Sequence, residues 1–359
     1  MAEGQKRALR RGWTTGACAA AAARAAFSAL LCGRFEDPVS IRLPRGEAPS
    51  FPLALRELKS ASARAGVVKD AGDDPDVTHG ALVIAETAWA ERGSGIRFAA
   101  GEGVGVVTRR GLSLPPGEPA INPAPRAMIR ETLCQLAAAK GAPQPDLLVT
   151  ISIPGGERLA RGTMNARLGI EGGLSILGTT GIVIPYSCSS WVHSIHRGVD
   201  VARAAGLDHI AAATGATSEK AVQRLYGLPP HALIDMGDFV GALLKYLRRH
   251  PVAKLTLAAG FAKCAKLAQG QLDLHSGRSS LDLPALASLL AAEGVGGPEL
   301  EAAASAGEIL ALAGEKRARL AARVASRARE VALATLAGQS AVEVAIVDRD
   351  GAFLARVGG

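Results

Sequence analysis

Residues 209–269 read HIAAATGATSEKAVQRLYGLPPHALIDMGDFVGALLKYLRRHPVAKLTLAAGFAKCAKLAQ, and short apolar runs alternate there with longer amphipathic ones. The short runs have the length of strands, and the longer ones carry apolar residues at helical spacing. We therefore expect strands at His209–Ala213, Ala232–Met236 and Leu255–Ala259, and helices at Ser218–Tyr226, Phe239–Arg249 and Phe261–Gln269. Strands that alternate with helices usually form a parallel sheet with crossover helices. This stretch predicts an α/β domain with a mostly parallel, Rossmann-like sheet.

The predicted α/β domain extends on both sides of this stretch. A helix from about Ser194 to Ala205 precedes it, and three further helical stretches continue it to about Ala337. The tail then resembles two strands joined by a turn at Asp348–Gly351, where Asp and Gly favour a hairpin. We assign residues 193–359 to this domain, with C-terminal helices and a hairpin.

Residues 1–192 show a different pattern. Thr14 and Thr15 can cap a helix that runs to about Leu31, and Asn122 before Pro123 opens a second helix to about Lys140. Short apolar runs bounded by turn residues predict strands at 39–43, 63–69, 81–89, 96–99, 104–108 and 147–153. Glycine-dense loops with little regular structure follow at 153–157 and 168–182. The pattern predicts an α+β domain with short strands and glycine-rich loops.

Composition limits the classes of function. The 359 residues carry a net charge of +8, which suits an acidic ligand or a nucleic acid, but only 4% of them are aromatic and the basic residues are scattered. The five cysteines form no C-x-x-C, which argues against disulfides and zinc. Arg24 interrupts the apolar N-terminal stretch and argues against a signal peptide. We expect a cytoplasmic enzyme that binds neither nucleic acid nor membrane.

The segment KDAGDDPDVTHG, residues 69–80, concentrates ionisable side chains in one turn between two expected strands. They are Asp70, Asp73, Asp74, Asp76 and His79. Repulsion among these carboxylates has to be relieved by solvent, by a divalent cation, or by a ligand that offers hydroxyls, positive charge or a proton. The spacing is not that of an EF-hand loop. The residues favour a ligand-binding or catalytic turn, with a solvated turn and a metal site as alternatives.

Two glycine motifs offer backbone amides to a ligand. AAGEGVGVVT, residues 99–108, resembles a nucleotide-binding loop, but its valines predict a strand where a Rossmann fingerprint opens a helix. It is therefore either a glycine hairpin or a loop that lets a ligand approach the backbone. GTTG, Gly178–Gly181, repeats the TTG of residues 14–16, and both can present hydroxyls and amides to an anion. Helix capping alone also explains Thr14 and Thr15.

The α/β domain adds candidates of its own. Asp238 follows a strand, where doubly wound sheets bind ligands, although it could merely cap the next helix. Lys263 and Lys266 could hold carboxylates or lie on a solvated helix face, and His275 follows in a loop. No G-x-S-x-G, H-E-x-x-H or G-x-x-x-x-G-K-[ST] motif occurs. Residue chemistry alone thus indicates an acidic or nucleotide-like small molecule and no particular reaction.

The motifs taken together resemble the cobalt-precorrin-5B C1-methyltransferase family of cobalamin biosynthesis, the CbiD-type enzymes. The resemblance follows in order RRGWTTGACAAAAARAA, KDAGDDPDVTHGA, GEGVGVVT, GEPAINPAPR, SIPGGE, LGIEGGLSILGTTGIV, GDFVG and AGFAKCAKLAQGQLDLHS. The chain differs after GTTGIV: family members often continue with a proline, a serine and acidic residues, whereas here residues 184–189 read IPYSCS. The last ninety residues show little that matches.

The resemblance implies transfer of a methyl group from S-adenosylmethionine to C1 of precorrin-5B, with or without cobalt, giving precorrin-6A. It implies no protein-bound metal. As catalytic residues we expect Asp70, Asp74 and His79. For the methyl donor we expect Asp73, Asp76, Glu102, Gly103, Gly178, Thr179, Thr180 and Gly181. For the macrocycle and its carboxylates we expect Thr14, Thr15, Arg126, Gly155, Gly156, Asp238, Lys263, Lys266 and His275.

Two other functions stay open at this point. One is a phosphate-transferring α+β enzyme that uses the two glycine motifs, and the other is a non-catalytic corrinoid-binding protein. The expected partners are the tetrapyrrole substrate, a second copy of the chain in a homodimer, and neighbouring enzymes of the pathway in transient contact.

Overall fold

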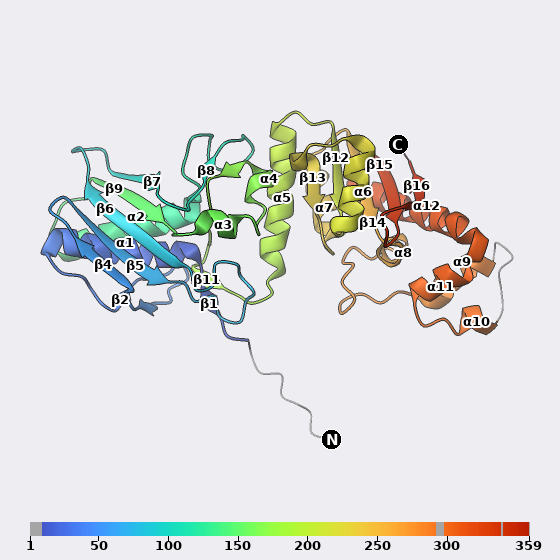
Figure 1. Ribbon diagram of the computed structural model, residues 1–359, viewed down its shortest axis with the longest axis horizontal. Coiled ribbons are helices and arrows are strands. Elements are labelled where there is room, and N and C mark those ends of the chain that lie inside the picture. The colour runs from blue at the N-terminus through green and yellow to red at the C-terminus, as the bar shows by residue number, and fades with distance from the viewer. Residues whose placement is uncertain (1–8, 292–297, 339, 359) are drawn as a thin grey trace, which may run out of the picture. The chain divides into compact units, whose positions relative to one another are not determined.

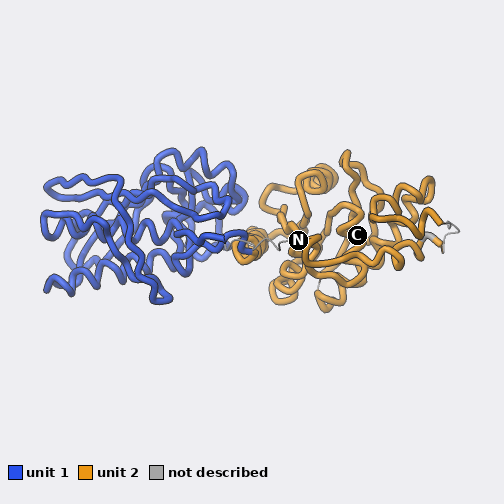
Figure 2. The backbone as a smooth tube through the Cα atoms, turned by 90° about the horizontal axis from the view of Figure 1, so that it is seen from below, with its two compact units in different colours: residues 1–187 blue, residues 188–359 orange. Residues whose placement is uncertain are grey.

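A computed structural model describes residues 9–291, 298–338 and 340–358 of the chain. The chain divides into two compact units, residues 1–187 and 188–359 (Figure 2). Each unit has its own sheet and hydrophobic core.

The first unit is built on a mixed five-stranded sheet in the order β4-β5-β6-β9-β7 (Figure 1). Only β7 and β9 are parallel neighbours, and the other pairs are antiparallel. The strands are β4 Leu55–Leu58, β5 Ser62–Val68, β6 Leu82–Trp89, β7 Ile96–Ala100 and β9 Leu147–Ser152. β4 was not expected. Its four residues, LREL, alternate between apolar and polar too briefly to distinguish a strand from a turn.

Two helices, α1 (Thr15–Cys32) and α2 (Pro123–Ala139), pack against this sheet and each other. α1 is capped by Thr14, whose hydroxyl accepts a hydrogen bond from the amide of Ala17 at 3.2 Å, as expected. Its alanines are buried on nearly every side because small side chains let the sheet and α2 approach closely. Of the described helices, α1 alone is long and apolar enough to cross a membrane, and 78% of it is buried inside its unit, as in a core helix.

The first unit also contains several short elements. β2 Val39–Ser40 and β8 Val106–Val107 lie within the strands expected at 39–43 and 104–108 but are shorter. Six others were not expected: β1 Gly12–Trp13, β3 Ser50–Phe51, α3 Gly156–Ala160, α4 Asn165–Leu168, β10 Ile170–Glu171 and β11 Ile182–Val183. β1 pairs with β11 and β8 with β10, so partners distant in sequence make these two-residue strands. Sequence periodicity cannot reveal such short pairings.

The second unit carries a five-stranded sheet in the order β13-β12-β14-β15-β16. The first four strands are parallel, and β16 runs antiparallel to β15 in the expected hairpin. The strands are β12 His209–Ala213, β13 Leu233–Asp235, β14 Lys254–Ala259, β15 Ala341–Val347 and β16 Phe353–Val357. β12 has the bounds that its apolar run predicts.

Helices cover both faces of this sheet. α6 (Ala216–Tyr226) packs on one face, and α5 (Cys188–Ala204), α7 (Val240–Leu247), α8 (Phe261–Ala268) and α12 (Arg317–Leu336) contribute to the core on the other. The remaining helices are α9 Leu283–Ala291, α10 Pro298–Glu301 and α11 Ala306–Leu312, with short 3-10 turns at Pro230–Ala232 and Gly314–Lys316. α5 begins six residues before the expected Ser194. Between α8 and the hairpin, the described residues form four helices, α9 to α12, where three were expected.

Candidate active site

Three segments of the first unit meet beside the start of α1. The first is the acidic turn, which we define as Lys69–Gly80, and the second is the segment Arg10–Thr14. The amide of Trp13 donates to the carbonyl of Asp70 at 2.7 Å, and the amide of Asp73 donates to the carbonyl of Arg10 at 3.0 Å. The third segment is Leu177–Val183, in which the carbonyl of Gly181 accepts a hydrogen bond from the amide of Thr14 at 2.9 Å. Three motifs that lie far apart in the sequence therefore form one surface.

Basic groups neutralise two carboxylates of the acidic turn. The guanidinium of Arg10 donates hydrogen bonds to both carboxylate oxygens of Asp70, with Nη2 2.8 Å from Oδ1. Lys69, only 1% exposed, places its ammonium 2.6 Å from Oδ2 of Asp76. Thr78 donates its amide and hydroxyl to the other oxygen of Asp76 at 2.7 and 2.6 Å. Repulsion in the turn is thus relieved by the chain's own partners.

These partners lower the pKa of both carboxyl groups, those of Asp70 and Asp76. Hydrogen bonds from Arg10, then from the amide of Gly72, lower the pKa of Asp70 to about 2. Burial alone would raise the pKa of Asp76, but the Lys69 charge and the hydrogen bonds from Lys69 and Thr78 outweigh it and lower that pKa. Both groups are carboxylates at neutral pH, so neither can deliver a proton there.

Asp73, Asp74 and His79 keep hydrogen-bonding capacity. Asp73 accepts the amide of Arg10 at 2.6 Å, and Asp74 accepts the amide of Tyr186 at 2.8 Å. Each carboxylate has four acceptor positions, so most of them are left for a ligand. His79 accepts the amide of Ala71 on Nδ1 at 3.1 Å, which leaves Nε2 as the donor of the neutral ring. These are the groups of the turn that can meet hydroxyls or a positive charge.

A second cluster forms where three glycine loops cross. The carbonyl of Glu102 accepts the amide of Ile153 at 2.8 Å, and the carbonyl of Gly103 accepts the amide of Leu174 at 2.9 Å. A Cβ on Gly103 would overlap the carbonyl of Ile153, and one on Gly156 would overlap Gly103. Gly103 and Gly156, predicted to meet ligands, are therefore needed so that backbone can pack on backbone.

Open positions flank this glycine crossing. The carboxylate of Glu102 is exposed and has no partner among the described residues. Gly155, in the left-handed region with φ of +73°, has almost no neighbours around its missing Cβ. A free acid beside an exposed glycine turn is suited to bind ligand hydroxyls.

The threonines and Arg126 are engaged within the fold. Thr15 hydrogen-bonds the backbone of Leu177 through its hydroxyl, and Gly178 packs against Thr14. Thr180 contacts the backbone of Ile182 at 3.3–3.4 Å, whereas Thr179 is exposed. Gly181, with φ of +83°, packs on Leu43. Arg126 donates to the carbonyls of residues 119 and 121 and pairs with Glu118 at 2.8 Å.

Four predicted residues belong to the second unit. Lys263, on α8, places its ammonium 3.0 Å from the Asp238 carboxylate at the carboxyl edge of the parallel strands. Lys266 is buried and donates to the carbonyls of Leu274 and Ser279 at 3.1 and 2.9 Å, so it organises the following loop. His275 is exposed in that loop. Lys263 and Asp238 are thus placed at a sheet edge, whereas Lys266 serves the fold.

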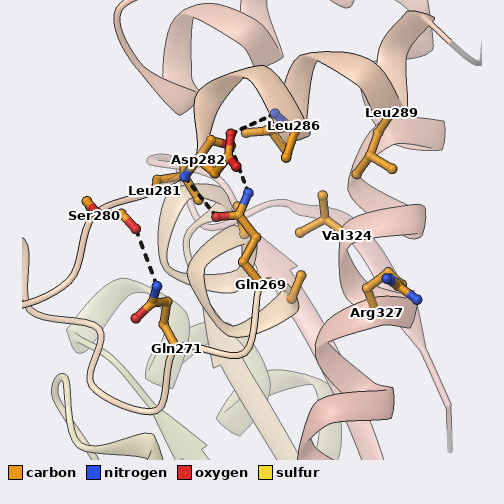
Figure 3. Close-up of a pocket in the computed structure, with 12 residues that line it drawn as sticks. Gln269, Gln271, Ser280, Leu281, Asp282, Leu286, Leu289, Val324 and Arg327 are labelled. Carbon is orange, nitrogen blue, oxygen red and sulfur yellow. Dashed lines mark hydrogen bonds between the residues drawn. The ribbon is translucent and has the colours of Figure 1, made fainter.

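A cavity of about 530 Å³ lies elsewhere in the second unit, between α8, α9 and α12 (Figure 3). Alanine and leucine side chains line much of it. At its rim the side-chain amide of Gln269 donates to the carbonyl of Asp282 at 2.8 Å and accepts the backbone amide of Asp282 at 2.9 Å. None of the predicted site residues lines it. Three of its polar side chains, Gln269, Gln271 and Asp282, already take part in hydrogen bonds within the unit.

Sequence reasoning missed three residues of the first unit. Arg10 clamps Asp70, Lys69 neutralises Asp76 and Tyr186 is attached to Asp74. A lysine directly before an acidic cluster is a signal for Lys69, but no local pattern connects Arg10 or Tyr186 to the turn. Within the described ranges, no three His, Cys, Asp or Glu side chains are grouped as metal ligands.

Comparison with known proteins gives consistent matches along the chain. The profile of the CbiD family matches residues 2–185, and that of the CbiD C-terminal domain matches residues 273–358, including the tail in which we found little to match. The cobalt-precorrin-5B C(1)-methyltransferase of Brucella anthropi is 57% identical, covering 98% of this chain and 97% of that protein. The protein of the same name from Methylorubrum extorquens is 58% identical, with 97% of each covered. A crystal structure of the cobalamin biosynthesis protein CbiD from Archaeoglobus fulgidus is 30% identical, with a TM-score of 0.41 over 75% of this chain and 83% of that one.

Proposed function

The chain belongs to the CbiD family, and on this premise we infer that it transfers a methyl group to carbon C1 of cobalt-precorrin-5B, a step of cobalamin biosynthesis. The observation that carries this conclusion is identity of 57–58% to named methyltransferases over nearly the whole chain. Phosphate transfer and non-catalytic corrinoid binding are not favoured, because these relatives are named as methyltransferases.

S-adenosylmethionine is the methyl donor that we propose, and its sulfonium supplies an activated methyl group. The first unit has groups that fit such a ligand. Glu102 offers an unpaired carboxylate for ribose hydroxyls, and Asp73 and Asp74 keep free acceptor positions for hydroxyls or positive charge. Thr179 and the amides of the Gly178–Gly181 loop would complete this donor side.

Catalysis by this site rests on positioning. Methyl transfer needs donor and acceptor in line, and two rigid loops that hold them face to face can supply much of the rate enhancement. Asp70 and Asp76 are held by Arg10 and Lys69, and in this proposal they shape the turn. Asp74 and His79 are then the groups of the turn that contact the reacting ligands.

The macrocycle carries acetate and propionate side chains, and basic groups suit them. Lys263 is 37% exposed at the carboxyl edge of the second unit's sheet, which we propose to be Rossmann-like, and it could exchange Asp238 for a substrate carboxylate. We propose further that the two domains are residues 1–192, which carry most of the motifs, and residues 193–359. A cytoplasmic homodimer in transient contact with neighbouring pathway enzymes completes the proposal.

The function is tested by incubating the protein with labelled S-adenosylmethionine and precorrin-5B, with and without cobalt. We expect a product heavier by one methyl group, together with S-adenosylhomocysteine. A protein that gives no such product and does not bind S-adenosylhomocysteine would refute the assignment. Hydrolysis of a nucleotide would instead favour phosphate transfer.

The placement of the site is tested by Asp74→Asn and His79→Ala. Each should lower kcat/KM by roughly tenfold or more, because a charged or donating contact to a ligand is worth about 1.5–3 kcal/mol. Glu131→Gln, an exposed carboxylate on α2 outside the motifs, is the matched control and should retain full activity. Full activity and unchanged donor affinity in both site variants would show that the acidic turn does not face the ligands.

A further inference from the structure

The segment Ile184–Ser187 is a tight turn with an unusual residue at its third position. The amide of Ser187 donates to the carbonyl of Ile184 at 3.2 Å, with Pro185 second and Tyr186 third. Tyr186 has φ of +56°. Proline followed by positive φ marks a type II turn, whose third position strongly favours glycine or asparagine. A tyrosine here stays in a backbone conformation that its side chain disfavours.

No helix cap accounts for a tyrosine in this conformation. Among the described residues, the other non-glycine residue with positive φ is Ala337, which is the left-handed C-cap of α12 and donates its amide to Leu333. Tyr186 ends no helix; it is held instead by Asp74 of the acidic turn, which accepts its amide at 2.8 Å. Residues held in such conformations are concentrated at binding and catalytic sites.

The turn presents an aromatic ring to solvent beside the candidate site. Tyr186 is 68% exposed, and Ile184 at the start of the same turn is 50% exposed. The phenol hydroxyl has no partner among the described residues. Tyr186 thus combines a disfavoured backbone conformation with an exposed ring. Its amide is hydrogen-bonded to Asp74 of the acidic turn.

We propose that Tyr186 is a substrate-binding residue that lays its ring against an apolar face of the tetrapyrrole macrocycle. This inference rests on the proposed function. A large ring with apolar faces suits an exposed aromatic side chain and the exposed Ile184 of the same turn, whereas the methyl donor's hydroxyls and charged groups suit the carboxylates of the acidic turn. The link to Asp74 places the macrocycle next to the groups assigned to the donor.

The central test compares Tyr186→Gly with Tyr186→Phe in the full chain. Glycine suits the turn and removes the ring, so we expect the KM for precorrin-5B to rise about tenfold, with the KM for S-adenosylmethionine unchanged. Phenylalanine keeps the ring and should stay within about twofold of the natural chain. Ala337→Gly is the matched control: it relieves the other positive φ without removing a ring, and both KM values should be unchanged.

Macrocycle binding without methyl donor separates this inference from the proposed function. Equilibrium dialysis of precorrin-5B, followed by its visible absorbance, should show about tenfold weaker binding to Tyr186→Gly, whether or not the natural chain transfers a methyl group. Equal macrocycle affinity in the natural chain and Tyr186→Gly would overturn the inference, and so would a rise confined to the methyl donor's KM. If Tyr186→Gly does not fold, Tyr186→Asn, which also tolerates positive φ, provides the same comparison.

Discussion

The ammonium of Lys69 lies in the core at the entrance to the acidic turn, and one carboxylate neutralises it. A buried cation is tolerated only with such a partner, because transfer of a charge from water into a protein interior is costly. Lys69 is 1% exposed, and Asp76 shields it from one side while remaining 26% exposed itself. The pair therefore fixes the position of the turn more than it contributes net stability.

We predict that Asp76→Asn lowers the free energy of unfolding of the first unit by about 3 kcal/mol, because Lys69 keeps its charge without a partner. Urea unfolding followed by tryptophan fluorescence measures this, and adding Lys69→Met should recover part of the loss. Asp73→Asn, an exposed acid of the same turn, should change stability by no more than about 0.5 kcal/mol. An equal loss in both variants would contradict the prediction.

The pH dependence of this pair follows from the lowered pKa of Asp76. A carboxyl with a lower pKa in the folded state stabilises the fold fully above its unfolded value of about 3.9. The contribution is lost as the pH falls through the folded pKa. The pair therefore gives constant support at neutral pH and fails only in strong acid.

At the scale of elements, the glycine crossing shows why loops can be rigid. Gly103 and Gly156 meet backbone to backbone, so neither position has room for a methyl group. Such contacts hold loops together without side-chain packing, and they leave the outward amides available to a ligand.

We predict that Gly156→Ala destabilises the first unit by about 3 kcal/mol, because the added methyl overlaps the backbone of Gly103 and cannot rotate away. Thermal unfolding measured by circular dichroism would show the loss. Gly162→Ala is the matched control, since its Cβ would be in ordinary contact at 3.5–3.6 Å. It should be neutral or stabilising by up to about 1 kcal/mol. Equal stability of the two variants would exclude a steric role for Gly156.

The last hairpin of the second unit is joined to the sheet by a buried acid. Glu343 on β15 is 1% exposed, and its carboxylate accepts hydrogen bonds from Tyr226, from Thr256 at 2.8 Å and from Arg356 at 2.9 and 3.1 Å. Burial raises the pKa of Glu343, but these bonds outweigh it and hold that pKa below its ordinary value. The network connects β14, β15, β16 and α6.

We predict that Arg356→Met moves the acid unfolding of the second unit to higher pH. Without Arg356 the pKa of Glu343 rises, so the carboxylate's contribution is lost at a less acidic pH. Stability at neutral pH should fall by about 2 kcal/mol. Fluorescence of Trp191 against pH follows this unit. Arg224→Met, an exposed arginine on α6, should leave the transition in place; an unshifted transition in Arg356→Met would contradict the assignment.

At the scale of the whole molecule, the net charge of +8 should attract a macrocycle that carries several carboxylates. We predict that raising salt from about 0.05 M to about 0.5 M increases the KM for precorrin-5B several-fold, because added ions screen attraction between exposed charges. The KM for S-adenosylmethionine, which carries a sulfonium, should not increase in the same series. A salt-independent KM for the macrocycle would show that its carboxylates do not contribute measurably.

Much of the fold could be predicted from periodicity. The parallel strands β12, β13 and β14, helix α1 with its Thr14 cap, and the C-terminal hairpin all follow from apolar spacing and local turn residues. The two-residue strands β1 and β11 could not be predicted, because each exists only through its partner about 170 residues away. The same holds for the site: the acidic turn and the glycine loops are visible as motifs, but their partners are not.

The sequence by itself determined the residue types and the family, since ordered motifs, unlike single residues, are specific enough to identify relatives. Only the tertiary structure decided which acids are available. Asp70 and Asp76 were expected to meet ligands as much as Asp74 was, yet Arg10 and Lys69 engage them while Asp74 holds Tyr186. The physical reason is that a side chain's free hydrogen-bonding capacity depends on neighbours in space, and folding brings those neighbours from distant parts of the chain.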